Sequence, residues 1–153
     1  MGKTAARNKR AYRDFDFEEF YEAGIVLRGT EVKSLRQGRC SLKDGYAKVT
    51  DGEVFLHNVH IARYEQGNRE NHEPRRKRKL LLRKPEIKRL IGKTQQKGYS
   101  LIPVEIYFKN GYAKVKLGLG RGRKEYDKRR KIKKKDQERR IEKKLKEHSR
   151  GEF

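Results

Sequence analysis

The 153-residue sequence has almost no residues that form covalent cross-links and no stretch suited to a membrane. Cys40 is the only cysteine, so an internal disulfide is excluded and a cysteine-based zinc site would lack partners. No apolar run approaches the roughly 20 residues of a transmembrane helix, and no secretory hydrophobic segment follows the basic N-terminus. The sequence also lacks a lipid-anchor motif and a broadly apolar amphipathic helix. We therefore expect a cytoplasmic protein in a reducing compartment, without a membrane partner.

Acidic side chains are scarce beside basic ones. The chain holds 43 lysines and arginines against 21 acidic residues, a net charge of +22. Such an excess would repel itself unless the usual partner is a polyanion that releases counterions on binding, and nucleic acid is the leading candidate. With 33% hydrophobic and 42% charged residues, the chain can build one modest core but cannot enclose itself entirely. We expect one domain with loose segments.

Charge and apolar content divide the chain into three parts. Residues 1–13 hold five basic side chains and no acidic one, which predicts a mobile basic arm or simply a frayed terminus. Residues 14–120 contain the aromatic and β-branched runs and form the predicted barrel. Residues 121–153 hold 16 basic and 7 acidic side chains, a net charge of +9, and too few aliphatic residues for a continuous stripe. We predict that this basic C-terminal tail is a coil when free and becomes helical when phosphates neutralise it.

A glycine-rich stretch, Gly118–Gly122, lies where the barrel meets the tail. It has the composition of a phosphate cradle but lacks the Lys-Ser/Thr pair that follows in a P-loop. We predict instead a flexible joint between the two parts.

Two hairpins stand out, each with two strands joined by a turn dipeptide. Asp51-Gly52 and Asn110-Gly111 favour the positive φ angles of tight hairpin turns. The β-branched run at 23–27 predicts another buried strand. The hairpin strands are predicted at 46–50 and 53–59, and at 101–108 and 112–119.

Two helical patterns are expected beside these strands. Thr30 is a suitable N-cap for a short helix that Gly38 ends, and Glu31 in its first turn complements the helix dipole. Pro85 opens a second helix, with apolar residues at the spacing of one face, that ends near Gly98. Short strands, tight turns and no βαβ rhythm indicate a mainly β fold: a small OB-like barrel with two or three short helices and the basic C-terminal tail.

Catalytic and metal-binding motifs are poorly represented. His57 and His60 lie close together, with Cys40 and His72 elsewhere, but alternation along a strand would send His57 and His60 to opposite faces. There is no nucleophile elbow and no pair of acids in an obvious cleft. We therefore expect no enzymatic activity, no metal, no cofactor and no small-molecule substrate.

RNA is the polyanion that these side chains suit best, because proteins read RNA through its shape, phosphates and 2′-hydroxyls and stack exposed bases on aromatic rings and arginine planes. A single arginine on so basic a protein is more often solvated than bound, so the cluster carries the prediction rather than any one member. Within His72–Pro85, the leucines at 80–82 are predicted to start a core strand that holds the basic loop before them against RNA. The candidate contacts are Arg36, Arg39, His57, His60, Arg63, His72, Arg75 and Arg78.

Several motifs in this order resemble one known family, small protein B (SmpB), the SsrA-binding proteins. The resemblance covers the chain from about Tyr12 through the tail. The motifs are Gly29-Thr-Glu-Val-Lys-Ser-Leu-Arg36, Ser41-Leu-Lys-Asp-Gly-Tyr-Ala47, His72-Glu-Pro with Lys79-Leu-Leu-Leu82, and Asp127-Lys-Arg129 before the end of the tail.

The resemblance implies an OB-like barrel without catalytic activity of its own. Such a protein binds the tRNA-like domain of transfer-messenger RNA and delivers it to stalled ribosomes for trans-translation, with elongation factor Tu in the delivery complex. The tail then enters the empty mRNA channel near the small-subunit decoding centre and becomes helical there. A ribosomal protein or assembly factor, also small, basic and tailed, is the alternative among binding proteins.

The resemblance adds Glu31, Lys79 and Leu90 to the RNA-binding residues. Because a carboxylate cannot favour bare phosphate, Glu31 either orients neighbouring basic groups or accepts a hydrogen bond from a base. Without an RNA role, Glu31 would stabilise the helix dipole and Leu90 would pack in the core. In the tail, Tyr126 is expected to stack on a ribosomal base. The residues expected at the decoding centre and mRNA channel are Lys124, Tyr126, Asp127, Lys128, Arg129, Lys133, Lys134 and Arg140.

Overall fold

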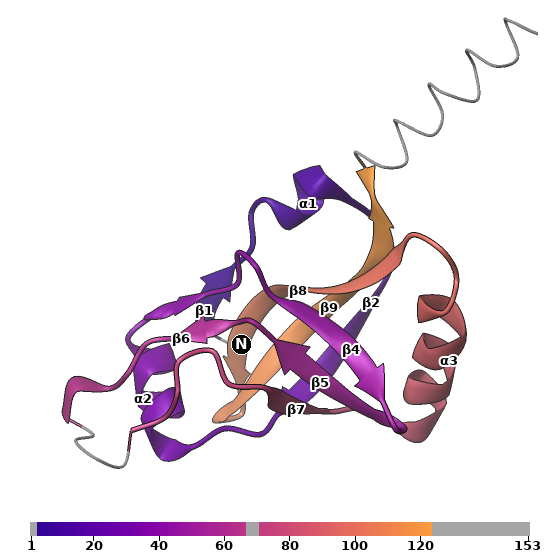
Figure 1. Cartoon of the computed structure of the whole chain (residues 1–153). Helices are drawn as coiled ribbons and strands as arrows, with labels where there is room; N and C mark the ends of the chain where they lie inside the picture. The colour runs from indigo at the N-terminus through magenta and orange to yellow at the C-terminus, as the bar shows by residue number, and fades with distance from the viewer. Residues whose placement is uncertain (1–2, 67–70, 124–153) are drawn as a thin grey trace, which may run out of the picture.

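The fold was obtained as a computed structural model, which describes residues 3–66 and 71–123 (Figure 1). Strands dominate these residues, and within them no helix is long and apolar enough to cross a membrane. The elements in chain order are β1 (Lys3–Arg7), α1 (Ala11–Asp14), β2 (Phe15–Ile25), α2 (Gly29–Arg36), β3 (Cys40–Ser41), β4 (Tyr46–Thr50), β5 (Glu53–His57), β6 (His60–Ile61), β7 (Arg78–Leu81), α3 (Lys84–Thr94), β8 (Tyr99–Lys109) and β9 (Tyr112–Gly122).

The main sheet closes into a barrel. Its strands are hydrogen-bonded in the order β8-β4-β5-β7-β2-β9, and β9 pairs again with β8, so the ring has no free edge. Its pairings are antiparallel, and β1 adds to β8 from outside the ring. The prediction of a mainly β barrel with short helices is confirmed.

The two turn dipeptides form the hairpins that their composition predicts. Asp51 and Gly52 have φ angles of 52° and 75° and join β4 to β5. Asn110 and Gly111 have φ angles of 52° and 81° and join β8 to β9. Positive φ at both central positions matches the right-handed twist of the flanking strands. Both hairpins are confirmed, although β5 ends at His57 instead of residue 59 and β8 and β9 are longer than expected at 11 residues each.

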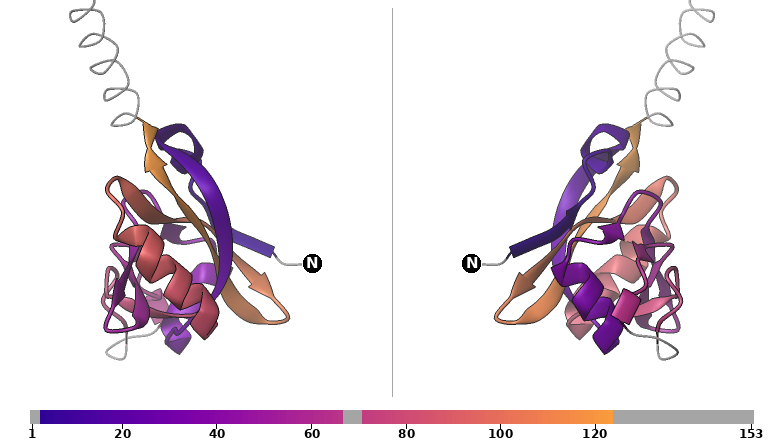
Figure 2. Two further views of the ribbon diagram at one scale, coloured as in Figure 1. Left: turned by 90° about the vertical axis from the view of Figure 1, so that its right-hand side faces the viewer. Right: turned by 90° about the vertical axis from the view of Figure 1, so that its left-hand side faces the viewer.

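The core fills the barrel and continues under two helices on its opposite sides. Side chains alternate along the first part of β9, so Val115 and Leu117 are buried while Tyr112 is exposed. Leu35 of α2 and Leu90 of α3 are buried in the same core. Figure 2 shows α3 on the side facing the viewer in one view and α2 on the side facing the viewer in the other. The two helices therefore lie on different sides of the barrel.

Residues 3–13 are part of the fold, which corrects the expectation of a mobile arm for the described part of residues 1–13. Strand β1 pairs with β8, with Lys3 opposite Phe108 and Arg7 opposite Glu105. Asn8 is buried and its Nδ2 donates to the carbonyl oxygens of Leu42 (3.2 Å) and Pro103 (3.3 Å). The prediction failed because backbone pairing with a distant strand leaves no trace in the charge of the segment.

Residues Gly118–Gly122 belong to strand β9, and Gly118 and Gly120 serve close packing, so the prediction of a flexible joint is wrong. They lie within β9, and a Cβ on Gly118 would come within 2.6 Å of the Phe17 ring. A Cβ on Gly120 would come within 2.2 Å of the Asp16 carbonyl oxygen. The absent side chains let β2 approach β9, and the barrel therefore extends at least to Gly122.

Candidate nucleic-acid interface

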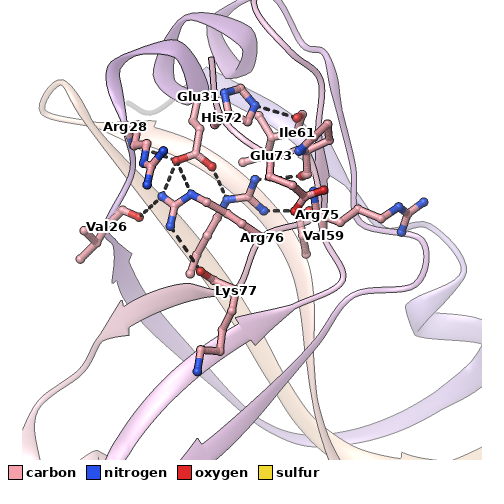
Figure 3. Close-up of polar contacts among 12 residues, drawn as sticks. Val26, Arg28, Glu31, Val59, Ile61, His72, Glu73, Arg75, Arg76 and Lys77 are labelled. Carbon is pink, nitrogen blue, oxygen red and sulfur yellow. Dashed lines mark hydrogen bonds and ion pairs between the residues drawn. The ribbon is translucent and has the colours of Figure 1, made fainter. Parts of the chain in front are cut away.

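A buried carboxylate ties the start of α2 to the basic stretch before β7 (Figure 3). Glu31 is fully buried. Its Oε1 accepts hydrogen bonds from the backbone N–H of Arg28 (2.8 Å) and from Nε of Arg76 (3.0 Å), and Nη2 of Arg76 is a further donor to this oxygen. Its Oε2 accepts from Nε of Arg78. We call Glu31, Arg76 and Arg78 the buried ion-pair cluster.

Arg78 is fully buried as well, and each arm of its guanidinium has a partner. Nη1 donates to the carbonyl oxygen of Val59 (2.8 Å), and Nη2 donates to that of Pro74 (2.9 Å). Burial lowers the pKa of Arg78, although the bond to Glu31 opposes this shift. A buried charge persists only when it is paired and hydrogen-bonded, and the planar fork of arginine satisfies both conditions at once.

The titration of Glu31 reflects the same contacts. Burial alone would raise the pKa of its carboxyl, but hydrogen bonds from Arg76, from the Arg28 backbone and from Arg78 hold the pKa below its ordinary value of 4.5. Glu31 is therefore ionised at neutral pH and offers the two arginines a full negative charge.

His72 makes a second tie between α2 and the segment that precedes β7. It is buried, and its Nε2 donates to the carbonyl oxygen of Ile61 (2.8 Å) because a carbonyl can only accept. Its Nδ1 lies 2.8 Å from Oγ1 of Thr30. The prediction that Thr30 caps α2 is therefore wrong, because Thr30 lies inside the helix. The N-cap residue is Arg28, and its backbone N–H donates to Glu31. Gly38, with φ of 71°, does follow the end of the helix as expected.

The cluster and His72 fix residues 71–77, which we call the basic loop. Alternation explains which side chains point inward, because Arg76 and Arg78 share the parity of the buried Leu80 while Lys77 and Lys79 are exposed. In Figure 3 Arg75 points away from Glu31. Its Nη1 donates to Oδ1 of Asn58 (2.8 Å). The inward arginines anchor the loop, and the outward cations remain available at the surface.

The predicted RNA contacts fall into three groups by exposure. Five are exposed, and Arg39 lies beside the segment of Arg63, since its carbonyl accepts from the Ala62 N–H at 3.0 Å. His57 and His60 are partly buried, whereas four others have no exposed surface for a direct contact. The exposed residues are Arg36, Arg39, Arg63, Arg75 and Lys79; the buried ones are Glu31, His72, Arg78 and Leu90.

Burial argues against direct RNA contacts by Glu31 and Leu90 in this structure. Glu31 orients Arg76 and Arg78, and neither of its oxygens is open to a base in this structure. Leu90 packs in the core beneath α3, on another side of the barrel from α2 (Figure 1). Sequence reasoning missed Arg76 and the contact between Thr30 and His72. Arg76 lies an even number of positions before the buried Leu80, and this spacing would have identified it as an inward residue.

The two neighbouring histidines are arranged differently from the prediction. Asn58, with φ of 59°, ends β5 after His57, and His60 lies in the separate strand β6 opposite Ser41. Alternation within one strand therefore does not describe them. In residues 3–66 and 71–123, no three His, Cys, Asp or Glu side chains gather as a metal site would require. Burial raises the pKa of Cys40 to about 12.

The tail residues from Lys124 to Arg140 that the resemblance implicates lie outside the described residues. Their roles stay predictions.

Fold and surface together define a class: a small antiparallel barrel whose basic loop is anchored by a buried carboxylate. The family model described as "SmpB protein" matches residues 5–147, and the chain belongs to this family. An "SsrA-binding protein" of Halothermothrix orenii is 60% identical over 148 residues, covering 97% of this chain and 96% of that protein. The "SsrA-binding protein" of Bacillus subtilis is 57% identical over 150 residues, with 98% and 96% covered.

A solved structure supports the same assignment. A chain from the work described as "tmRNA-SmpB: a journey to the center of the bacterial ribosome" superposes with a TM-score of 0.66 at 55% identity. The match covers 76% of this chain and 82% of that chain. The resemblance seen in the sequence motifs is therefore confirmed by both comparisons.

Proposed function

We propose that this protein binds the tRNA-like domain of transfer-messenger RNA and delivers it to stalled ribosomes in the cytoplasm, as a binding factor without catalytic activity. The observation that carries the proposal is the basic loop held in place by the buried Glu31. Anchoring a loop of cations before RNA arrives lowers the ordering entropy lost on binding. The curated relatives named SsrA-binding proteins and the solved tmRNA-SmpB chain support the choice of RNA.

The exposed and the buried residues among the predicted contacts have different roles in this proposal. The exposed residues near the basic loop, Arg39, Arg63 and Arg75, contact phosphates and sugars, which position a protein on RNA. Glu31, Arg78 and His72 act through the loop that they hold. Loss of a positioning residue should weaken RNA binding only as far as it disturbs that loop.

The tail has a separate task in the proposed cycle. We assign Lys124 to Arg140 to the empty mRNA channel and decoding centre, where the tail becomes helical and Tyr126 stacks on a ribosomal base. Elongation factor Tu accompanies the complex during delivery. The net charge of +9 on residues 121–153 supports a polyanionic surrounding for this segment. Tyr126→Phe should preserve peptide-tagging activity and Tyr126→Ala should abolish it.

A salt titration tests the division between barrel and tail. Binding to the tRNA-like fragment and to an ordinary tRNA is measured for the full chain and for a version ending at Arg123, one residue past β9. Both versions should prefer the tRNA-like fragment with similar affinity across the salt range. Loss of preference on truncation would place recognition in the tail. Equal affinity for both RNAs at every salt concentration would favour a ribosomal protein or assembly factor.

A further inference from the structure

A second cationic surface lies on the outside of β4, β5 and β7, which are neighbours at the front of Figure 1. Strand alternation sends Val54 and Leu56 into the core, so Phe55 and His57 face outward. Tyr46 pairs across the strands with His57, Lys48 with Phe55, and Phe55 in turn with Lys79. We call these five residues, together with Lys77, the outer face.

Tyr46 and His57 form a stacked pair. Their ring centroids are 5.1 Å apart and the rings are nearly parallel, at 9°. Tyr46 is 45% exposed although it packs on His57. A flat ring that is held by one neighbour and open to solvent is preorganised to receive another flat ring.

His57 contributes a neutral ring to this stack. Burial, helped by the charges of Lys77 and Lys48, lowers the pKa of His57 from its ordinary value of 6.5. At neutral pH its imidazole is therefore mostly uncharged. The pair presents aromatic surface instead of a further cation.

Ammonium groups lie beside the rings. Nζ of Lys77 is 4.5 Å from the centroid of Phe55, and Lys48 and Lys79 flank the same ring on β4 and β7. Lys48, Lys77 and Lys79 are all exposed, and Nζ of Lys79 lies 3.1 Å from Oε1 of Glu53. Aromatic rings interleaved with cations are the arrangement by which proteins bind single-stranded nucleic acid, with bases on rings and phosphates on cations.

We propose that the outer face binds an unpaired nucleotide of RNA, whose base stacks on Tyr46 and whose phosphate lies near Lys48 and Lys77. This inference rests on the proposed function and adds to it a stacking site on β4 and β5, beside the basic loop, whose last residue, Lys77, belongs to both surfaces. A purely acidic partner such as an acidic peptide would use the ammonium groups but leave the exposed ring of Tyr46 unused. A fully paired helix would keep its bases out of reach of the ring.

The absence of tryptophan from the whole chain makes the site directly observable. Tyr46→Trp creates a single fluorescent reporter in the stack, and Tyr112→Trp creates a matched control at the 72% exposed position that begins β9. Saturating tRNA-like RNA should quench the tryptophan of Tyr46→Trp strongly and leave that of Tyr112→Trp nearly unchanged. Fluorescence anisotropy of labelled RNA reports total affinity in the same samples.

Substitution of the ring completes the test. Tyr46→Phe should retain RNA affinity, whereas Tyr46→Ala should weaken it about fivefold to 160-fold, the range found when one base-stacking aromatic is lost. Circular dichroism and thermal unfolding verify that both variants are folded. A blunt RNA duplex without unpaired bases and a polyglutamate peptide serve as comparison probes at the same ionic strength.

The outcomes separate this inference from the proposed function. Normal RNA affinity without quenching in Tyr46→Trp, or with Tyr46→Ala matching Tyr46→Phe, overturns the stacking site and leaves the function standing. Equal quenching by the duplex or by polyglutamate overturns the unpaired nucleotide as ligand. Failure of the unmodified chain to prefer the tRNA-like RNA overturns the proposed function itself.

Discussion

The buried ion-pair cluster and the outer face use neighbouring residues of one basic stretch in opposite ways. Arg76 and Arg78 turn inward and share Glu31, whereas Lys77 and Lys79 turn outward over the aromatic and acidic side chains of β5. The guanidinium fork satisfies several buried acceptors, and the strongly hydrated ammonium stays in water. Neighbouring side chains that each carry one positive charge thus anchor the loop at one position and are available for ligand binding at the next.

Removal of the buried carboxylate should cause the largest change in stability and in RNA binding. Glu31→Gln leaves the two arginines without a counter-charge, and breaking a buried ion pair typically costs about 3–5 kcal/mol. We expect a drop of that size in the free energy of unfolding measured by urea denaturation, together with weaker RNA binding. Glu53→Gln, which removes the exposed partner of Lys79, is the control and should change stability by less than about 1 kcal/mol. Equal losses in the two variants would erase the distinction between the regions.

Exchange of lysine and arginine should destabilise the protein at the inward position 78 and have little effect at the outward position 79. Arg78→Lys keeps the charge but loses donors to the carbonyls of Val59 and Pro74, at a cost of about 2 kcal/mol or more. The reciprocal Lys79→Arg lies in solvent and should stay within about 0.5 kcal/mol. Thermal unfolding of both variants checks this, and a well-tolerated Arg78→Lys would mean that charge alone anchors the loop.

Acid should loosen the buried cluster. The pKa of Glu31 is lowered on folding, so its contribution to stability is present above its ordinary value of 4.5 and is lost as pH falls through the folded-state value. The expected loss is about 1.4 kcal/mol per pH unit for one carboxyl. Urea midpoints measured from pH 6 downward should fall less steeply for Glu31→Gln than for the unmodified chain.

A second carboxyl also has a lowered pKa and needs its own control. Hydrogen bonds from Arg89 and Tyr21 lower the pKa of Glu19 to about 2. Glu19→Gln should remove only its own part of the acid dependence, leaving that of Glu31. An unchanged slope in Glu31→Gln would show that Glu31 does not drive acid unfolding.

Neutralisation of an outward lysine should have the smallest effect. Lys77→Gln is expected to leave the free energy of unfolding within about 0.5 kcal/mol. It should reduce the dependence of RNA affinity on salt, lowering the logarithmic slope by roughly 0.7–0.9 for one lost phosphate contact. Binding isotherms at four or five salt concentrations measure this slope. An unaltered slope would place Lys77 outside the RNA interface and weaken the contrast with Arg76.

Local signals in the sequence were sufficient for much of the fold. Asp51-Gly52 and Asn110-Gly111 predicted both hairpins because their positive φ angles are a property of the dipeptides themselves. The helix beginning near Pro85 and the end of α2 at Gly38 were equally local. The charge of +22 and the family motifs are properties of the sequence alone, and both indicate RNA.

Tertiary structure alone decided which residues met across long separations. Glu31 and Arg78 are 47 positions apart, and Asn8 and Pro103 are 95 apart, so no local pattern could pair them. The sequence wrongly predicted a flexible joint at Gly118 and Gly120. The reason for these glycines is the close approach of β2, which only the folded structure shows. Residue types and turn propensities act over a few positions, whereas burial depends on which distant strands close the barrel. The sequence by itself therefore determined the protein's chemistry and its hairpins, and the closed barrel decided which charges are anchors and which remain free to bind.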